Sequence, residues 1–325
     1  MKALKIIMLS TLVIGLAVVS VLWHDLKPAL AQDKQYRIAV VVHGSDTDPF
    51  WKPVKKGVED ASSLYTDLKV TYTGTTAYSL EGFMGNLRSA LEAKPDALVC
   101  TLTEPDAMDE TLRAAIGAGL PVIGINAPDL REPVDARIPV LTYVGEDSYL
   151  VGVIAAKETL KRFTPKQAVF CNFHPGAANI LARGQGWIDT MKAKGIPVEA
   201  IDISADPAKW AKIVAAYLKE HPETDALFIS NTGVAQAIIE YLQAAGIDVG
   251  SRIKIAQMDV SPRILDYIQQ GKIMFTLDQQ PYLQGYLGVV LAYLNLKYRF
   301  TPPPAPLSTG PAIITKADID PTKSY

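Results

Sequence analysis

The sequence predicts an α/β protein made of two similar, doubly wound parallel-sheet lobes. Apolar runs of strand length recur along the chain, and several are apolar at consecutive positions, which is typical of strands covered on both faces. Stretches with helical periodicity separate these runs, which indicates βαβ units with right-handed crossovers. The pattern runs twice along the chain, so we expect two halves of related topology.

Ten apolar runs are the predicted strands, and each is bounded by turn or helix signals. In chain order they are Ile38–Val42, Leu68–Tyr72, Ala97–Cys100, Val122–Ile125, Val140–Val144, Ala168–Cys171, Val198–Ile203, Ala226–Ile229, Ile253–Met258 and Ile273–Leu277.

The stretches between the predicted strands have the apolar spacing of helices. One stripe over residues 210–218 and another over 234–242 follow the i, i+3, i+4, i+7 pattern of a buried helix face. The turn from helix to strand at Lys94–Leu98 recurs at Glu223–Leu227, which supports the duplication. The C-terminal tail contains Pro302-Pro303-Pro304, so we expect it to form no regular element and to run along the surface.

Composition excludes several classes of protein. The chain has 325 residues, is 49% hydrophobic and 20% charged, and has a formal net charge of −2. That length suggests two domains and is typical of a globular protein rather than a disordered or fibrous one. No basic excess is present to neutralise phosphates, so we expect no nucleic-acid partner. Beyond Tyr36 no apolar run approaches the length of a membrane span, which excludes a polytopic membrane protein.

Residues 1–31 have the pattern of a secretory signal peptide. Lys2 and Lys5 precede an apolar stretch from Ile6 to Leu22, and small residues precede a cleavage point after Ala31. The alternative is that this stretch stays uncleaved as an anchor. Either way, we expect the rest of the chain to be exported to the periplasm.

The two cysteines end apolar runs in different predicted strands. Cys100 and Cys171 are 71 positions apart, each after three apolar residues, where a cysteine behaves as a small buried hydrophobe. An exported protein can form a disulfide, but bridging requires close Cα atoms. Two free buried thiols are the favoured prediction, with a disulfide as the alternative.

Motifs of catalysis are absent from the sequence. It contains no G-x-S-x-G elbow, Walker A motif, H-E-x-x-H or C-x-x-C. The segment Arg183–Trp187 begins like a dinucleotide-binding glycine motif placed before a helix, but it lacks the third glycine. The histidines are too dispersed to indicate a metal site. We therefore expect neither a metal nor a cofactor, and a protein that is not an enzyme.

Polar and aromatic residues gather directly after the predicted strands. The first strand leads to Asp48-Pro49-Phe50-Trp51, although an aromatic pair at a helix start is also an ordinary staple. Asn231 and Asp259 are placed where N-caps of helices occur. In parallel sheets the carboxyl ends of strands form the ligand-binding edge, so a shared site is the functional interpretation. Residues of this kind after later strands are Asn126, His174, Arg183, Asn231, Asp259 and Gln279.

These landmarks resemble the type I periplasmic sugar-binding proteins of ABC importers, in particular the ribose-binding group. The similarity covers nearly all of the chain beyond the signal segment. It depends on six motifs in order: Asp48-Pro49-Phe50-Trp51, Leu120–Asn126, Ala182–Trp187, Ser230–Ala235, Met258-Asp259 and Asp278-Gln279-Gln280-Pro281.

The resemblance implies two lobes joined by a three-segment hinge, with crossings near Val144, Gln279 and Pro306–Thr309. A sugar or polyol between the lobes would hold them closed for a membrane permease, and a chemoreceptor or sensor kinase is a further partner class. The implied division is 36–144 plus 280–307 for the N-terminal lobe and 145–279 plus 308–320 for the C-terminal lobe.

The resemblance also implies roles for individual residues. Phe50 and Trp51 would stack on the faces of a sugar ring, and Asp48 lies where the ribose group has a polar ligand. Arg183 would donate to hydroxyl oxygens, and Asp259 would accept from hydroxyl hydrogens.

Asn231 and Gln279 would both donate and accept, and His174 is a further candidate contact. The motif departs from the ribose group at Asn126-Ala127, where an Asp-Arg pair is usual. This departure argues against ribose itself while keeping a monosaccharide or related polyol. The alternatives are a protein that binds a cyclic autoinducer and an exported carbohydrate-active enzyme that uses Asp48 and Asp259.

Overall fold

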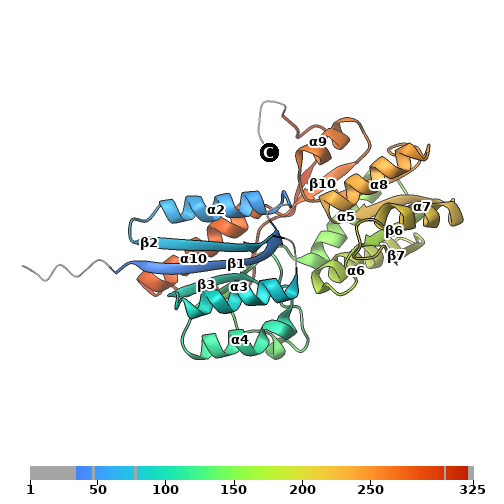
Figure 1. The fold of residues 1–325 in the computed structure, drawn as a ribbon. Helices are drawn as coiled ribbons and strands as arrows, with labels where there is room; N and C mark the ends of the chain where they lie inside the picture. The colour runs from blue at the N-terminus through green and yellow to red at the C-terminus, as the bar shows by residue number, and fades with distance from the viewer. Residues whose placement is uncertain (1–33, 46–47, 77–78, 304, 321–325) are drawn as a thin grey trace, which may run out of the picture.

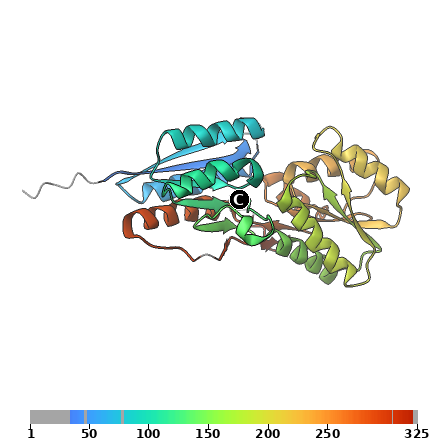
Figure 2. The ribbon, with the colours of Figure 1, turned by 90° about the horizontal axis from the view of Figure 1, so that it is seen from below.

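The computed structural model describes residues 34–45, 48–76, 79–303 and 305–320. These residues form two α/β lobes that lie side by side and are joined near the middle of the molecule (Figures 1 and 2). Each lobe has one mostly parallel sheet, and six strands are assigned to each within the described residues. The predicted fold class is therefore confirmed. The predicted signal peptide, residues 1–31, lies outside the described residues.

Sheet A forms the core of the first lobe, with strand order β11-β5-β4-β3-β1-β2. Its strands are β1 (Tyr36–Ser45), β2 (Leu68–Thr75), β3 (Ala97–Thr101), β4 (Val122–Ile125), β5 (Thr142–Gly145) and β11 (Leu307–Ser308).

Sheet B forms the core of the second lobe, with strand order β12-β10-β9-β8-β6-β7. Its strands are β6 (Gln167–Asn172), β7 (Val198–Asp202), β8 (Thr224–Ile229), β9 (Lys254–Met258), β10 (Phe275–Asp278) and β12 (Ala312–Ile314).

Helices cover both faces of each sheet. The central strands are therefore buried on both sides, which is why their sequences are nearly continuous apolar runs. On sheet A, α2 (Trp51–Ser63) and α10 (Pro281–Tyr298) share a core with one face, and α3 (Leu80–Glu92) and α4 (Pro105–Gly117) cover the other. On sheet B, α5 (Ser148–Arg162) and α6 (Ala178–Lys192) share a core with one face of the sheet. The opposite face has α7 (Trp210–Glu220), α8 (Thr232–Ala244) and α9 (Pro262–Gln269), and a short 3-10 helix, η1 (Val134–Ala136), follows β4.

Side-chain caps fix where several of these helices begin. Ser79, Asp147, Asn231 and Ser261 each accept a hydrogen bond from a backbone N–H in the first turn. Asn231 is the cap that the sequence predicted for α8. Asp259 is not a cap, because the chain makes a further turn and Ser261 begins α9 instead.

All ten predicted strands are confirmed, since each overlaps one of β1 to β10. The prediction that the tail forms no regular element is wrong, although most of its described residues are exposed or half-buried, as predicted for a segment on the surface. The proline-rich segment is followed by β11, which pairs with β5 in parallel, and by β12, which pairs with β10 antiparallel. These strands have two and three residues, and the neighbouring sheet edges rather than any local pattern specify them.

In the described residues the chain passes between the sheets at three places: after β5, after β10 and after β11. Buried polar side chains tie these passages together. Thr309 Oγ1 donates to the Gln279 carbonyl oxygen at 2.9 Å, and Gln284 Nε2 lies 3.2 Å from Thr309 Oγ1. Thr309 N–H also donates to the Gly145 carbonyl at 3.0 Å, so all three passages share one hydrogen-bond network. The residue boundaries of the two lobes stay a prediction.

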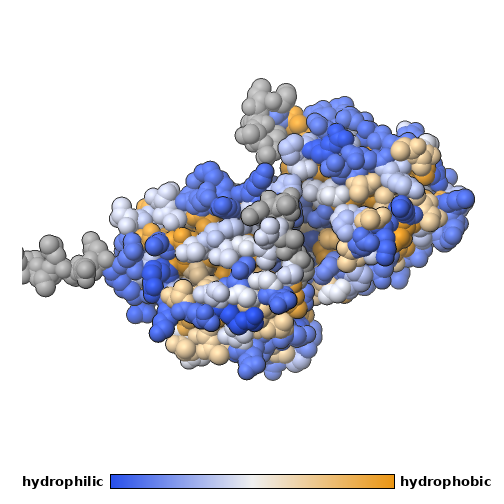
Figure 3. All heavy atoms as spheres, in the orientation of Figure 1, coloured by the Kyte–Doolittle hydropathy of each residue, from blue (hydrophilic) through white to orange (hydrophobic). Residues whose placement is uncertain are grey.

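Cys100 and Cys171 are free and buried, in β3 and β6 of different sheets. The favoured prediction of two free thiols is confirmed. None of the described helices is long and apolar enough to cross a bilayer. The face of the two lobes in Figure 3 is mainly hydrophilic, with scattered hydrophobic residues between the charged ones.

Candidate functional site

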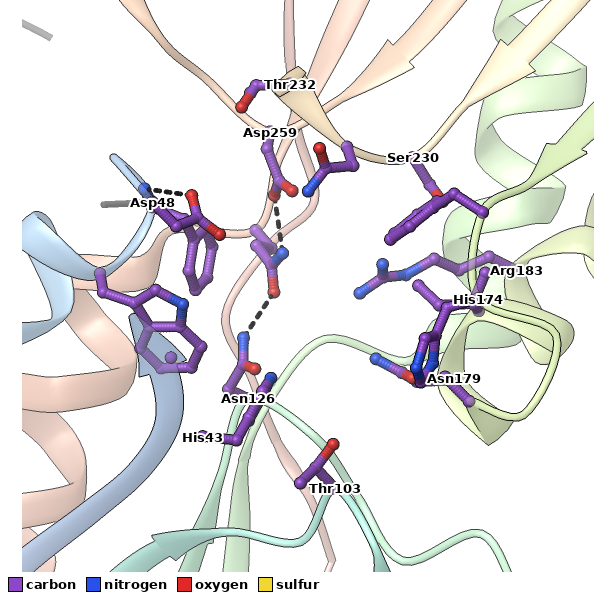
Figure 4. A pocket seen from close by; sticks show the side chains of 18 residues that line it. His43, Asp48, Thr103, Asn126, His174, Asn179, Arg183, Ser230, Thr232 and Asp259 are labelled. Carbon is purple, nitrogen blue, oxygen red and sulfur yellow. Dashed lines mark hydrogen bonds between the residues drawn. The ribbon is translucent and has the colours of Figure 1, made fainter. Parts of the chain in front are cut away.

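A cleft of about 250 Å³ lies between the two lobes, at the carboxyl ends of parallel strands from both sheets. This edge is where open α/β sheets bind ligands. Figure 4 shows side chains of both lobes converging on it. The lining residues are His43, Gly44, Asp48, Phe50, Trp51, Thr103, Asn126, Phe173, His174, Ala177, Asn179, Ile180, Arg183, Ser230, Asn231, Thr232, Asp259 and Gln279.

The first lobe contributes an aromatic wall from the loop between β1 and α2. Asp48 Oδ1 accepts the backbone N–H of Phe50 at 3.0 Å, which shapes the turn into α2. The rings of Phe50 and Trp51 meet edge to face at 5.1 Å, and His43 meets Trp51 in the same way at 4.9 Å. This interlocked cluster presents aromatic surface beside a carboxylate.

The second lobe contributes Arg183, which lies in α6 and points into the cleft (Figure 4). The expectation that its glycine motif stands before a helix is wrong, because Arg183–Trp187 lies inside α6. The two glycines serve packing instead. A Cβ on Gly184 would lie 2.5 Å from the Phe170 ring, and one on Gly186 would lie 2.1 Å from the Tyr149 carbonyl oxygen.

Arg183 is paired with Glu146, a residue that sequence reasoning missed. Nε and Nη2 of Arg183 donate to Glu146 Oε1 at 3.2 and 2.7 Å, and Ser148 Oγ donates to the same oxygen at 2.7 Å. Arg183 is 4% exposed and Glu146 is 1% exposed, so both charges are buried. Glu146 follows β5 directly, so the rule that polar residues follow strands could have found it.

A chain of buried amides links the lobes at the back of the cleft. Asn126 Nδ2 lies 3.3 Å from Gln279 Oε1, and Gln279 Nε2 donates to Asp259 Oδ1 at 2.7 Å. Asn126 and Asp259 have φ of 63° and 79°, in the left-handed region that asparagine and aspartate tolerate better than most residues. The link runs from the first lobe, through the hinge, to the second (Figure 4).

Burial changes the protonation of the groups that face the cleft. Desolvation raises the pKa of Asp259 to about 7, although Arg183 and the Gln279 hydrogen bond oppose the shift. Desolvation also raises the pKa of Asp48, against the hydrogen bond from Phe50. The pKa of His43 falls to about 4, mainly through desolvation and in part through His174. These shifts follow from burial of the three groups in the cleft wall, where a hydrogen bond is electrostatically stronger than in water.

The structure brings all nine predicted site residues to this cleft. Asp48, Phe50, Trp51, Asn126, His174, Arg183, Asn231, Asp259 and Gln279 all line it. Whether each of them binds a ligand stays a prediction. Asn231 already accepts the Val234 N–H at 3.1 Å through Oδ1, which orients its amide.

Sequence reasoning missed further lining residues: Thr103, Phe173, Asn179, Ser230 and Thr232. Thr103, Phe173 and Ser230 follow β3, β6 and β8 within two residues, so the strand-end rule could have included them. Asn179 lies in the first turn of α6 and carries no such signal. Among the described residues, no group of three or more His, Cys, Asp or Glu side chains could hold a metal ion.

Two lobes of matching topology, three connecting passages and a polar and aromatic cleft between them define a hinged, two-lobed α/β binding protein. The periplasmic binding protein domain matches residues 38–299, and the chain belongs to that family. The resemblance stated from the sequence motifs is thereby confirmed.

Curated relatives cover most of this chain. A xylose/arabinose-binding protein of Sulfolobus acidocaldarius is 27% identical over 87% of this chain and 72% of its own length. A ribose import binding protein of Bacillus subtilis is 24% identical over 80% of this chain and 81% of its own length.

Solved structures agree with the fold. An ABC transporter solute-binding protein of Agrobacterium vitis bound with α-D-tagatopyranose has a TM-score of 0.78 and 26% identity, over 88% of this chain and 97% of its own. A periplasmic sugar-binding protein of Legionella pneumophila has a TM-score of 0.75 and 25% identity, over 84% of this chain and 99% of its own.

Proposed function

We propose that this protein is the extracytoplasmic solute-binding component of an ABC importer, and that it captures a monosaccharide or related polyol between its lobes. Relatives named as sugar-binding and sugar-import proteins support this class of function. The proposal includes a periplasmic location, export through residues 1–31 and no catalytic activity.

The observation that carries the proposal is the complementary chemistry of the two cleft walls. Phe50 and Trp51 from the first lobe line the same cleft as Arg183, Asn231 and Asp259 from the second, and Figure 4 shows Asp48 of the first lobe and Arg183 of the second on opposite sides of it. A sugar ring has apolar C–H faces that pack on aromatic rings and a rim of hydroxyls, each of which donates and accepts a hydrogen bond. A site that pairs every hydroxyl rejects analogues, because a missing partner leaves a buried group unsatisfied.

The size of the cleft favours a single ring. Its volume of about 250 Å³ lies just below the range of about 300–1,000 Å³ common for small-molecule pockets. A monosaccharide or a cyclic polyol suits this volume better than an oligosaccharide. Pentoses come first among the candidates, since the two relatives are named for xylose, arabinose and ribose.

Hinge closure gives the mechanism of capture and delivery. A small molecule that contacts both walls binds the closed form more tightly than the open one, and this difference in affinity shifts the population toward closure. In the proposal, the lobes rotate about the three passages after β5, β10 and β11, where the chain leaves one sheet for the other. In the proposal, membrane permease subunits recognise the closed form, and a chemoreceptor or sensor kinase is a further reader of it.

The test is a thermal-shift screen followed by calorimetry. Because a ligand that binds only the native state raises the melting temperature, we expect at least one of D-xylose, L-arabinose, D-ribose, D-galactose or myo-inositol to do so. Micromolar dissociation constants correspond to about −8 kcal/mol. A response only to cyclic autoinducers, or to no compound in the panel, contradicts the proposal.

The same samples separate a carrier from an enzyme. After prolonged incubation with a bound sugar, a carrier returns the sugar chemically intact, and this is the expected result by chromatography. Conversion of the sugar would instead assign hydrolytic or transfer chemistry to the pair Asp48 and Asp259.

A further inference from the structure

The cleft has only one guanidinium among the residues described as lining it, and that guanidinium is already neutralised. Arg183 shares the lining with two carboxylates, Asp48 and Asp259, and with the imidazoles of His43 and His174. Desolvation keeps the pKa of His43 near 4, so this imidazole is uncharged at neutral pH. The charge that Arg183 offers to a guest therefore depends on Glu146, which hydrogen-bonds it, and on Asp259 when that carboxyl is ionised.

Glu146 binds one edge of the guanidinium and leaves the other edge for the cleft. Its Oε1 accepts from both Nε and Nη2 of Arg183. The remaining nitrogen, Nη1, has no part in this pairing, and the Arg183 head extends toward the cleft (Figure 4). Arg183 can thus donate hydrogen bonds to a guest while its charge is balanced from behind.

Stability does not account for this buried pair. The second oxygen of Glu146, Oε2, is buried and has no hydrogen-bond partner among the described residues. A buried ion pair with an unsatisfied oxygen rarely stabilises a fold more than a well-packed apolar pair does, because both charges lose their hydration. The position of Glu146, between β5 and α5 at a passage between the lobes, sets it beside the site instead.

We propose that Glu146 is a specificity-determining residue: by neutralising Arg183 it makes the cleft select uncharged polyhydroxyl ligands over anionic ones, such as uronic acids. The inference rests on the proposed function and deepens it by naming the charge class of the substrate. The physical reason is that a guanidinium without a carboxylate partner is a strong bidentate site for a carboxylate or sulfate, whereas a paired one is not.

The test compares Glu146→Gln with the wild type at pH 6, below the Asp259 pKa of about 7, so that Glu146 rather than an ionised Asp259 balances the charge of Arg183. The probes are D-xylose, D-ribose and D-galactose as neutral sugars, and D-galacturonate and inorganic sulfate as anions. In the wild type we expect a neutral sugar, and neither anion, to raise the melting temperature. In Glu146→Gln we expect affinity for at least one anion to increase by about tenfold or more.

Glu158→Gln is the matched control. Glu158 lies on α5 of the same lobe and pairs with Lys161 and Arg162, and it does not line the cleft. Because sulfate stabilises many proteins by exclusion from their surface, this variant reports the general salt effect. Equal responses of the two variants to every anion overturn the proposal.

The double variant Glu146→Gln with Arg183→Gln shows whether Arg183 is the group that binds the anion. It also guards the test against loss of folding, since it removes both members of the buried ion pair together. We expect it to lose the affinity for anions that Glu146→Gln gains. Retention of that affinity contradicts the assignment to Arg183. A wild type that binds D-galacturonate as well as D-galactose overturns the charge selectivity but not sugar binding. A wild type that binds no neutral sugar overturns the proposed function. The comparison of anion affinity between the wild type and Glu146→Gln still tests whether Glu146 neutralises Arg183.

Discussion

The two lobes share one topology but contribute different chemistry to the cleft. The strand orders of sheets A and B match position by position, from β11 and β12 at one edge to β2 and β7 at the other. The first lobe nevertheless supplies an aromatic wall around Trp51, whereas the second supplies the buried charges Arg183 and Asp259. The repeated scaffold therefore fixes where side chains converge. The residues in the loops and helix starts determine the chemical character of each cleft wall.

The lobes also exchange helices. α5 follows β5 of sheet A but packs with α6 on sheet B, and α10 follows β10 of sheet B but packs with α2 on sheet A. Close glycine contacts join each pair. A Cβ on Gly152 would lie 2.0 Å from the Arg183 carbonyl oxygen, and one on Gly57 would lie 2.1 Å from the Tyr282 carbonyl oxygen.

The largest expected contrast between the lobes is electrostatic and appears in the pH dependence of stability. The folded state keeps a proton on Asp259 up to a pKa of about 7, whereas the unfolded chain releases it near 3.8. Because the folded state binds more protons at Asp259 in this window, this group alone should lower the free energy of unfolding by on the order of 4 kcal/mol as pH rises from about 4 to 7. His43, whose pKa burial lowers to about 4, contributes with the opposite sign between about pH 4 and 6.5, so the Asp259 contribution is the difference between wild type and variant. Denaturant titrations of the wild type and Asp259→Asn measure this, and an unchanged slope in the variant contradicts it.

The second contrast is the effect of each wall on binding. Arg183→Ala removes charge-assisted hydrogen bonds, so we expect about 100-fold weaker sugar binding. It also leaves Glu146 buried without its partner, so the melting temperature should fall. Phe50→Ala removes only aromatic contact and should weaken binding by about tenfold. Calorimetry on both variants decides the order, and affinity within about threefold of wild type in Arg183→Ala contradicts the role of the charged wall.

The third contrast tests the two helix pairs. Gly152→Ala and Gly57→Ala should each destabilise the protein by about 2 kcal/mol, because each forces two helices apart. Gly152→Ala displaces the backbone of Arg183 itself, so it should lose more sugar affinity than Gly57→Ala, which acts at Tyr282, three residues beyond Gln279. Equal affinity losses in both variants would indicate a general loosening of the hinge instead.

The smallest expected effect concerns the thiols. Cys100 and Cys171 occupy β3 and β6, and burial raises the pKa of each to about 12. We expect no reaction with Ellman's reagent in the native state, with or without sugar, and two reactive thiols after denaturation. A reductant should leave the melting temperature unchanged, and a shift would point to a disulfide.

The strands could be predicted because a strand that is buried on both faces needs apolar residues at nearly every position, as in Ala97–Thr101. β11 and β12 could not, since pairs of two or three residues form only where a sheet edge is already present. Their neighbours are supplied by chain more than 30 residues away, and no local periodicity records that.

The candidate site was predictable where it follows strands and less so where it depends on partners. Asn126 and Gln279 are visible at strand ends, but their hydrogen bond joins positions 153 residues apart. Glu146 is adjacent to a predicted strand, yet its importance for the site depends on its ion pair with Arg183, which lies on a helix of the other lobe. Charge balance within a cleft is a property of the assembled fold, so single positions do not reveal it.

The exchange of helices sets the order in which the two lobes can complete their cores as the chain emerges from its N-terminal end. All helices of the second lobe lie between Ser148 and Gln269, whereas the first lobe lacks a covering helix until residues 281–298 have been synthesised. Domains fold as units when their cores are complete, so the first lobe, although encoded first, must wait for α10, whereas the second lobe by then lacks only its edge strand β12 and the tail beyond it. A chaperone that holds the emerging chain would therefore cover the exposed apolar face of sheet A until α10 has emerged.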